Sequence, residues 1–339
     1  MSKNWFKNIG PGTLVAAAFI GPGTVTLCTL AGVNFGFNLL WAMVLSIVAT
    51  IVLQEMAARL GIISQRGLSD VIKSEIKNPI INKFMMLLIL SAIVIGNASY
   101  EAGNISGGIL GLETIVGELR FDLGIYSLNF LSLIVGIIAF VLLYIGNYKF
   151  LEKVLVTLVL VMSVSFLITA IITKPDIISI LKGAFIPTSP KGSLLTIIGL
   201  IGTTVVPYNL FLHASLVKEK WSDEKDLKAV RKDTIISIVL GGLVSMAIII
   251  SASSIPLGEI SNASDLAKSL APLYGDFSKY FLGIGLFAAG ITSAITAPLA
   301  AAYVVRGCFG WQIGLKSKRF RGVWMFILLM GVVFSSLGI

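Results

Sequence analysis

Two ionisable side chains are notable because apolar sequence surrounds each of them. Glu101 lies in the segment 97–104 (NASYEAGN), and it is the only one of the 17 acidic residues that we place well inside an apolar stretch. His213 is the only histidine of the chain. A carboxylate inside a membrane is a candidate functional group, and an imidazole titrates near neutral pH in water, so either side chain could carry protons. The structural alternative is that each is hydrogen-bonded within a core.

Glycine and proline interrupt two apolar segments at their middles. The stretch 16–34 contains Gly21-Pro22-Gly23-Thr24, and the stretch 192–217 contains Val206-Pro207-Tyr208. A broken helix exposes backbone groups that lipid cannot hydrogen-bond, so such breaks occur where protein or a polar cavity satisfies them. Two breaks at corresponding places in two halves of a chain indicate the substrate site of a secondary transporter. The residues that we expect around a bound solute are Gly21, Thr24, Val206 and Tyr208, together with Asn97 of the polar segment.

Composition indicates that the chain lives in a membrane. Hydrophobic residues make up 56% of its 339 residues, charged residues 13%, and the mean hydropathy is +0.94, values far from those of a soluble domain. A helix needs about 20 apolar residues to cross a bilayer. We therefore expect an all-α polytopic membrane protein with nine helices, at 9–34, 37–63, 82–111, 124–146, 149–173, 192–217, 233–256, 277–305 and 322–339.

The basic residues predict an orientation, because cytoplasmic loops of membrane proteins retain lysine and arginine. With the N-terminus inside, all but six of the 26 basic residues fall on the cytoplasmic side; the exceptions are Arg120, Lys174, Lys182, Lys191, Lys268 and Lys279. We predict an integral protein of the cell (inner or plasma) membrane with a cytoplasmic N-terminus. The net charge of +9 is scattered over these loops, which argues against a nucleic-acid partner.

Sequence motifs of several enzyme classes are missing. The chain has no GxGxxG or Walker-type loop, no HExxH motif, no nucleophile elbow and no pair of carboxylates placed for catalysis. Its two cysteines, Cys28 in a predicted span and Cys308 just after one, form neither a CxxC motif nor a disulfide framework. We expect neither enzyme activity nor a cofactor.

Several longer motifs carry a resemblance to a known family. They include 54–61 (QEMAARLG), 207–213 (PYNLFLH) and 290–296 (GITSAIT), and the similarity extends from Gly10 to the C-terminus. In these segments the chain resembles the natural resistance-associated macrophage protein (Nramp) family of proton-coupled divalent-metal transporters. The resemblance implies a LeuT-like fold of two inverted five-helix repeats with broken first and sixth helices. Here the repeats would be 1–175 and 176–339, and the tenth helix is missing from the sequence.

The residues at the two breaks depart from the family pattern. The family typically has Asp-Pro-Gly-Asn in the first break and Met-Pro-His in the second, whereas this chain has Gly21 and Thr24, then Val206 and Tyr208. The resemblance implies that all three side-chain metal ligands are replaced. Thr24 and Glu101 are then the only candidate side chains for a metal, and Glu101 matches a glutamate of the family's proton pathway.

Two further residues match family positions. His213 is the second histidine of the sixth-helix motif, which implies a proton relay. Arg321 matches an arginine expected to partner acidic residues of the third helix; a lipid anchor at the cytoplasmic face is an equal alternative.

Three functions remain open from the sequence. The first is a secondary transporter that moves a divalent metal cation by alternating access, with possible coupling to protons. The second keeps the fold but moves a non-metal solute, such as a small organic molecule or an anion, because helix N-termini at the breaks present positive dipole ends. The third is a transport-incompetent membrane scaffold or sensor. In each reading the partners are the bilayer and a small solute or ion.

Overall fold

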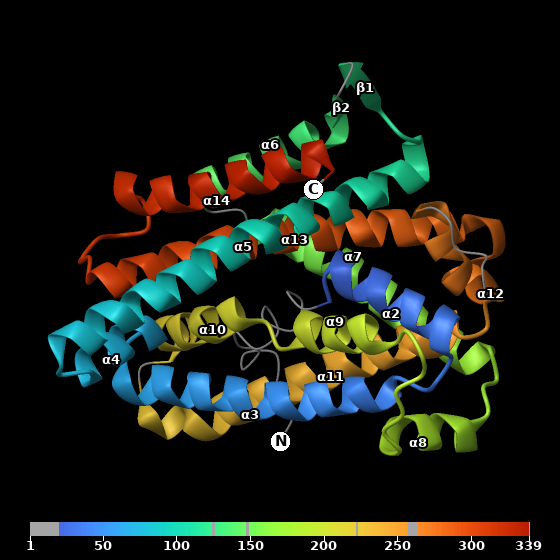
Figure 1. Ribbon diagram of the computed structural model, residues 1–339, viewed down its shortest axis with the longest axis horizontal. Coiled ribbons are helices and arrows are strands. Elements are labelled where there is room, and N and C mark those ends of the chain that lie inside the picture. Colours follow the sequence, from blue (N-terminus) through green and yellow to red (C-terminus); the bar gives the residue numbers. More distant parts are fainter. Residues whose placement is uncertain (1–19, 124–125, 147–148, 222, 257–262, 339) are drawn as a thin grey trace.

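Long helices make up almost all of the molecule (Figure 1). The computed structural model describes residues 20–123, 126–146, 149–221, 223–256 and 263–338. Among these residues, seven helical stretches are long and apolar enough to cross a membrane: Leu40–Ser64, Pro79–Val116, Lys153–Ile172, Leu194–Lys220, Glu224–Ala252, Asp265–Phe309 and Lys318–Leu337. A shorter apolar helix, Phe130–Ile145, accompanies them. The architecture is that of an all-α polytopic membrane protein, as the composition predicts.

The described residues of the first part form six helices and a small hairpin. In order they are α2 (Pro22–Phe35), α3 (Leu40–Ser64), α4 (Leu68–Glu75), α5 (Pro79–Val116), β1 (Arg120–Leu123), β2 (Tyr126–Asn129), α6 (Phe130–Ile145) and α7 (Lys149–Ile172). The expected boundary between repeats, at residues 175 and 176, falls in the connection that follows α7. The two-repeat organisation stays a prediction.

The second part begins with the short helix α8. Its elements are α8 (Ile177–Phe185), α9 (Leu194–Thr204), α10 (Pro207–Lys220), η2 (Glu224–Asp226), α11 (Leu227–Ala252), η3 (Ala263–Leu270), α12 (Ala271–Tyr274), η4 (Gly275–Phe277), α13 (Ser278–Phe309) and α14 (Lys318–Leu337). The predicted helices 37–63, 149–173, 233–256, 277–305 and 322–339 correspond to α3, α7, α11, α13 and α14, with ends that differ by several residues.

The predicted sixth helix is broken where the sequence places the break. α9 and α10 follow one another end to end in Figure 1, with Val205 and Val206 between them in non-helical conformations. Pro207 begins α10, a position where its missing N–H costs nothing. In the first predicted helix, 9–34, the structure describes the half after the break, α2, which likewise begins with a proline. Residues 9–19 lie outside the described part.

The predicted helix at 124–146 is wrong in its first turns. An antiparallel hairpin pairs Arg120 with Asn129, and α6 begins only at Phe130. Asn129 explains this start, because its side-chain oxygen accepts a hydrogen bond from the Leu131 N–H, and its amide donates to Glu113 Oε1 at the end of α5. The long apolar run that follows Asn129 outweighs the polar Ser127 and Asn129 in the sequence pattern, so the cap is not recognised.

Helices α5 and α13 form the centre of the molecule, and they pack closely at glycines. A Cβ atom on Gly290 would meet the backbone of Gly108, and one on Gly111 would meet the backbone at Gly283 and Phe287. Small residues thus let the two helices approach closely, as is common between membrane helices. The stretch Asp265–Phe309, which contains α13, is the most buried of the seven apolar stretches, with 83% of its most apolar part inside the protein.

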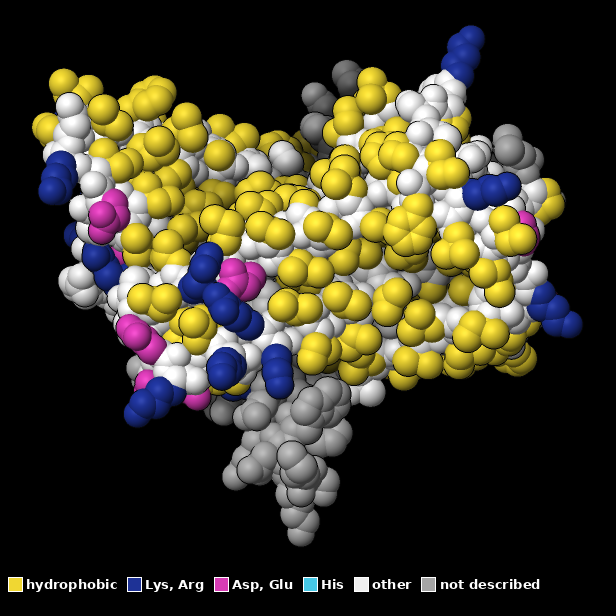
Figure 2. All heavy atoms as spheres, turned by 90° about the horizontal axis from the view of Figure 1, so that it is seen from below, with side chains coloured by type: hydrophobic (Ala, Val, Ile, Leu, Met, Phe, Trp, Pro, Cys, Tyr) yellow, Lys and Arg dark blue, Asp and Glu magenta, His cyan; other side chains and the backbone are white. Residues whose placement is uncertain are grey.

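The outer surface is apolar where a soluble protein would be polar. Many large hydrophobic side chains are exposed, among them Leu87, Ile95 and Ile171. Figure 2 shows hydrophobic side chains over the middle of one face, with Lys, Arg, Asp and Glu gathered mainly toward one end. An apolar belt bounded by charged ends is what a bilayer requires.

Candidate functional site

A cavity of about 380 Å³ lies where the two helix breaks meet α5. Its walls are formed by Gly21, Gly23 and Thr24 of the first break, by Thr203, Val206 and Tyr208 of the second, and by Gly96, Ser99, Tyr100, Gly103 and Asn104 of α5. The cavity therefore joins segments that are about 180 residues apart in sequence. The structure brings together four of the five residues that the sequence predicts around a solute, namely Gly21, Thr24, Val206 and Tyr208.

Helix ends give this cavity both signs of partial charge. α2 and α10 begin here, with Gly21 and Val206 as their N-cap residues. Neither residue caps its helix with a side-chain hydrogen bond. Helix N-termini carry unsatisfied N–H groups and a partial positive charge. α9 ends here with the opposite polarity, and the Gly202 carbonyl accepts a hydrogen bond from the Tyr100 hydroxyl at 3.2 Å. Carbonyl groups at this end can bind a cation.

Asn97 does not line the cavity. Its side chain is buried, and its amide donates to the Ala297 carbonyl of α13 at 2.8 Å. The prediction that Asn97 contacts a solute is therefore not supported by its position. Ser99, Tyr100, Asn104 and Thr203 line the cavity instead. The signal for the three on α5 is a run of small and polar residues spaced three and four apart, starting at Gly96, whereas Thr203 lies in the last turn of α9.

Glu101 lies directly behind this wall of the cavity. The carboxyl group is fully buried, and Asn104, which faces the cavity, donates from Nδ2 to Glu101 Oε2 at 3.3 Å. The second oxygen, Oε1, has no hydrogen-bond partner among the described residues. Gly331 of α14 packs against the side chain so closely that a Cβ there would overlap it. α14 thus closes off one side of Glu101, and Asn104 separates it from the cavity.

His213 belongs to a buried polar seam between α3 and α10, which we define as Thr50, Gln54, Asn209 and His213. His213 Nδ1 and Gln54 Oε1 are 2.8 Å apart. Because an amide oxygen can only accept, Nδ1 is assigned as the donor. In the described structure His213 Nε2, both polar atoms of the Asn209 amide and the Thr50 hydroxyl have no partner. Asn209 follows Tyr208 in the chain, so the seam begins beside the cavity.

The sequence pattern does not predict the seam as a unit. It singles out His213 as the only histidine, whereas Gln54 and Asn209 are parts of longer motifs. The spacing contains the signal, because Thr50 and Gln54 are four residues apart, as are Asn209 and His213. Such pairs share one helix face.

Arg321 lies apart from both groups, in the first turn of α14. Its guanidinium stacks on the Tyr144 ring at 4.4 Å and donates to the Tyr144 carbonyl at 3.4 Å. Within the described residues no ion pair links it to an acidic residue of α5, so the expected partnership stays a prediction without a contact to support it. Its position at the end of α6 leaves the lipid-facing role as the remaining prediction.

The donors of the cavity wall are neutral oxygens and backbone groups. Its lining residues include no Met, Cys or His, and no carboxylate. The described chain also holds no cluster of three or more His, Cys, Asp or Glu side chains of the kind that binds a metal. Hydroxyl, amide and carbonyl oxygens are ligands that suit hard cations better than soft ones.

Comparison with known proteins decides the family. The model of the Natural resistance-associated macrophage protein-like family matches residues 12–339. The chain belongs to the Nramp family. Curated Nramp relatives include a divalent metal cation transporter, MntH, of Caldanaerobacter subterraneus, which is 27% identical over 94% of this chain and 75% of its own length. The MntH protein of Bacillus subtilis is also 27% identical, over 92% of this chain and 73% of its own length.

Solved Nramp structures share the fold. Crystal structures of the manganese transporter of Eremococcus coleocola superpose with a TM-score of 0.76 at 20% identity. They cover 98% of this chain, which spans 72% of theirs. The likeness extends over nearly the whole chain. The Nramp relatives named here are transporters and not enzymes.

Proposed function

We propose that this protein is a secondary-active transporter that moves a divalent metal cation across the cell membrane by alternating access. The observation that carries the proposal is the cavity between the two helix breaks in a chain of the Nramp family. The names of the related transporters support a metal as the cargo. None of these relatives is named for a non-metal solute, so that alternative is left without support.

The oxygen ligands of the cavity wall favour a hard cation that keeps part of its hydration shell. A water molecule takes roughly 30 Å³ in the liquid, so a cavity of about 380 Å³ has room for an ion with its first hydration shell. Magnesium in particular gives up its waters reluctantly and takes oxygen ligands, and calcium and manganese also accept them. A soft transition metal would lack the sulfur or nitrogen ligand that selects it. Magnesium, calcium and manganese are therefore the ions that we expect to bind.

Glu101 supplies the negative charge that this ion requires. A divalent cation is costly in a low-dielectric site unless charge or strong dipoles replace its hydration. Glu101 is the buried carboxylate next to the wall, and it accepts a hydrogen bond from Asn104, which lines the cavity. Attraction between opposite charges is stronger in a low-dielectric interior than in water. Glu101 is also the group that would bind a coupled proton when the cation leaves.

The polar seam provides a second proton-binding group. His213 Nε2 is buried without a partner among the described residues, and the seam leads away from the cavity along α10 toward Lys220. Buried polar groups of this kind are usually satisfied by water. A hydrated seam would let His213 exchange protons with the cavity. We propose that this end of α10 faces the cytoplasm, because most basic side chains gather there.

Calorimetric titration of the purified protein with magnesium, calcium and manganese tests the metal proposal. We expect saturable binding that weakens at least about tenfold in Glu101→Gln, since charged interactions of buried groups are worth more than about 1.4 kcal/mol. Glu113→Gln is the matched control, because Glu113 is on the same helix and bonds Asn129 rather than facing the cavity. No divalent binding to the wild-type protein would refute the metal reading.

Uptake into proteoliposomes tests transport itself. We expect the same ions to enter vesicles, and acidification of the opposite side to change the rate. Binding without uptake would instead favour the third function, a scaffold or sensor that has kept the site. Uptake that is equal in wild type and Glu101→Gln would remove Glu101 from the mechanism.

A further inference from the structure

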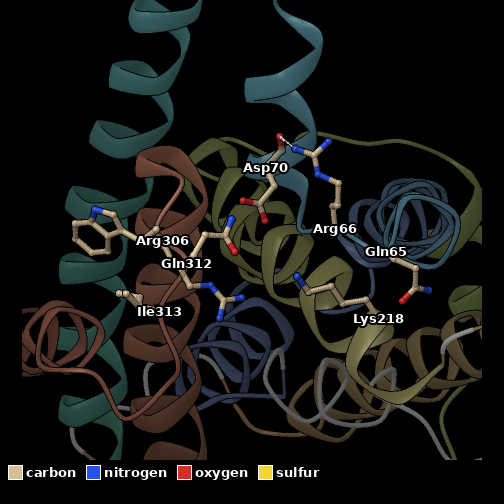
Figure 3. A pocket seen from close by; sticks show the side chains of 8 residues that line it. Gln65, Arg66, Asp70, Lys218, Arg306, Gln312 and Ile313 are labelled. Carbon is tan, nitrogen blue, oxygen red and sulfur yellow. Dashed lines mark hydrogen bonds between the residues drawn. The ribbon is translucent and has the colours of Figure 1, made fainter.

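A second cavity, of about 400 Å³, lies at the charged end of the molecule. It is formed where α3, α10 and α13 end and where α4 begins, far along α10 from the helix break. The side chains that matter are those of Arg66, Asp70, Lys218, Arg306 and Gln312, and Figure 3 shows Lys218 and Arg306 projecting into the same space. The proposed transport cycle uses none of these residues.

The charges around this cavity are unbalanced. Three cationic side chains, Arg66, Lys218 and Arg306, face a single carboxylate, Asp70. Asp70 is already engaged, because its Oδ2 accepts the N–H of Gly67 and caps α4. Within the described residues none of the three cations is in an ion pair. Two positive charges therefore remain uncompensated around one concave space, and this favours an anion.

Both arginines are held in place by neutral groups. Arg66 donates to the Ser74 hydroxyl at 3.0 Å and to the Asp70 carbonyl at 3.2 Å. Arg306 lies over the Tyr303 ring at 4.9 Å. These contacts fix the planar guanidinium groups without neutralising them and use only some of the five N–H donors of Arg66. Fixed guanidinium forks match the oxygens of phosphate.

A simpler role for two of the cations is to offset helix dipoles. Lys218 is in the last turn of α10, and Arg306 is in the last turn of α13, where positive side chains are stabilising. That role does not involve Arg66, which follows the C-cap of α3, nor does it require the three groups to share a cavity.

We propose that this cavity binds a phosphate-bearing anion, either a phospholipid headgroup or free phosphate.

Thermal unfolding in detergent tests this proposal with two probes. Inorganic phosphate and short-chain phosphatidylglycerol are titrated separately, with chloride at matched ionic strength as the reference. We expect a saturable rise in the midpoint temperature, because a ligand that binds the folded state stabilises it by mass action. In Lys218→Gln and in Arg66→Gln the apparent affinity falls about tenfold, the usual worth of one charge-assisted hydrogen bond. Lys228→Gln, an exposed lysine outside the cavity, is the matched control and keeps the response.

The outcomes separate the sources of the anion. A response to both probes means that the phosphate group alone is recognised, and a response to phosphatidylglycerol alone assigns the cavity to lipid. Short-chain phosphatidylcholine, which carries no net charge, should stabilise less than phosphatidylglycerol if the cavity binds an anion, and equal stabilisation by both lipids would count against an anion site. No stabilisation by either probe, or equal loss of the response in Lys228→Gln, would overturn the proposal. The metal titrations are independent of this result.

Discussion

At the scale of single residues, the substitutions at the two helix breaks decide which ion the cavity suits. Gly21 and Val206 occupy the N-cap positions of α2 and α10 and line the cavity. A carboxylate or thioether at either position would reach the same space. The present side chains offer neither, so oxygen donors of Thr24, Tyr208 and α5 remain.

Restoring two ligands should change the selectivity of the site. In Gly21→Asp combined with Val206→Met we expect manganese to bind at least about tenfold more tightly, because a carboxylate supplies charge within the cavity. Cadmium should bind only when the soft Met sulfur is present. Calorimetry of the double variant, with Gly21→Asp alone as the control, measures both effects. An unchanged manganese affinity would mean that the backbone at the breaks does not present these side chains to the ion.

The bond between His213 and Gln54 should appear as an energetic coupling. His213→Leu leaves Gln54 Oε1 buried without a donor, which costs about 1–3 kcal/mol of unfolding free energy. Gln54→Leu should cost a similar amount. The double variant removes both groups, so we expect it to lose about 0.5–3 kcal/mol less than the sum of the single variants. Chemical unfolding in one detergent measures all four proteins, and strictly additive losses would show that the bond carries no net stability.

At the scale of elements, close approaches of helices explain more than helix propensity does. Gly61 of α3 packs on the backbone of Ala214 in α10, so the two helices nearly touch just beyond the polar seam. This contact fixes how His213 meets Gln54. A side chain at this position would separate the elements on which the seam depends.

Gly61→Ala should therefore destabilise the protein. The added Cβ would overlap the Ala214 carbonyl oxygen and lie 2.9 Å from its Cα, and overpacking of this kind typically costs about 1–3 kcal/mol. Gly322→Ala on α14 is the matched control, because nothing lies within 4 Å of its added Cβ. That variant should be neutral or gain up to about 1 kcal/mol from higher helix propensity. Equal midpoints for the two variants in thermal unfolding would contradict the close contact.

The short helix α8 should depend on pH through its cap. Hydrogen bonds from the Ser179 hydroxyl and from the backbone N–H groups of Ile178 and Ser179 lower the pKa of Asp176 below its usual value. A lowered folded-state pKa stabilises the helix above the unfolded-state pKa, and the gain is lost as the pH falls through the folded value. Amide-exchange protection of Ile178 and Ser179 should decrease on acidification. In Asp176→Asn, a neutral cap, protection should not change with pH; if it still does, another group is responsible.

The long elements were predictable from sequence, and the short ones were not. Apolar runs near bilayer length locate helices such as α3 and α7, and glycine with proline locates the break before Pro207, because both signals are local. α4, α8 and the hairpin are too short to give an apolar window. Which face of α5 borders the cavity is also not a local property. Tyr100 lines it, whereas Glu101, about 100° further around the helix, turns behind the wall.

At the scale of the whole molecule, the fold places the cavity between the helix breaks midway along an apolar belt. Ser99 lies near the middle of α5 and lines the cavity, whereas Ser91, two turns earlier on the same helix, is exposed between the apolar side chains Leu87 and Leu88. If the chain is in a bilayer and the cavity opens to water, Ser99 faces water whereas Ser91 faces lipid.

Cysteine labelling in proteoliposomes measures that difference. A thiol reacts as the thiolate, which needs water, so a water-soluble maleimide should label Ser99→Cys and leave Ser91→Cys unmodified. The native Cys28 and Cys308 are buried, and the wild-type protein gives their background. A saturating transported cation should slow labelling of Ser99→Cys, since the ion and the reagent compete for one space. Labelling at both positions would show that water reaches both faces of α5, which contradicts a bilayer around Ser91. Labelling of Ser99→Cys that no cation slows would show that the cation does not bind in this cavity.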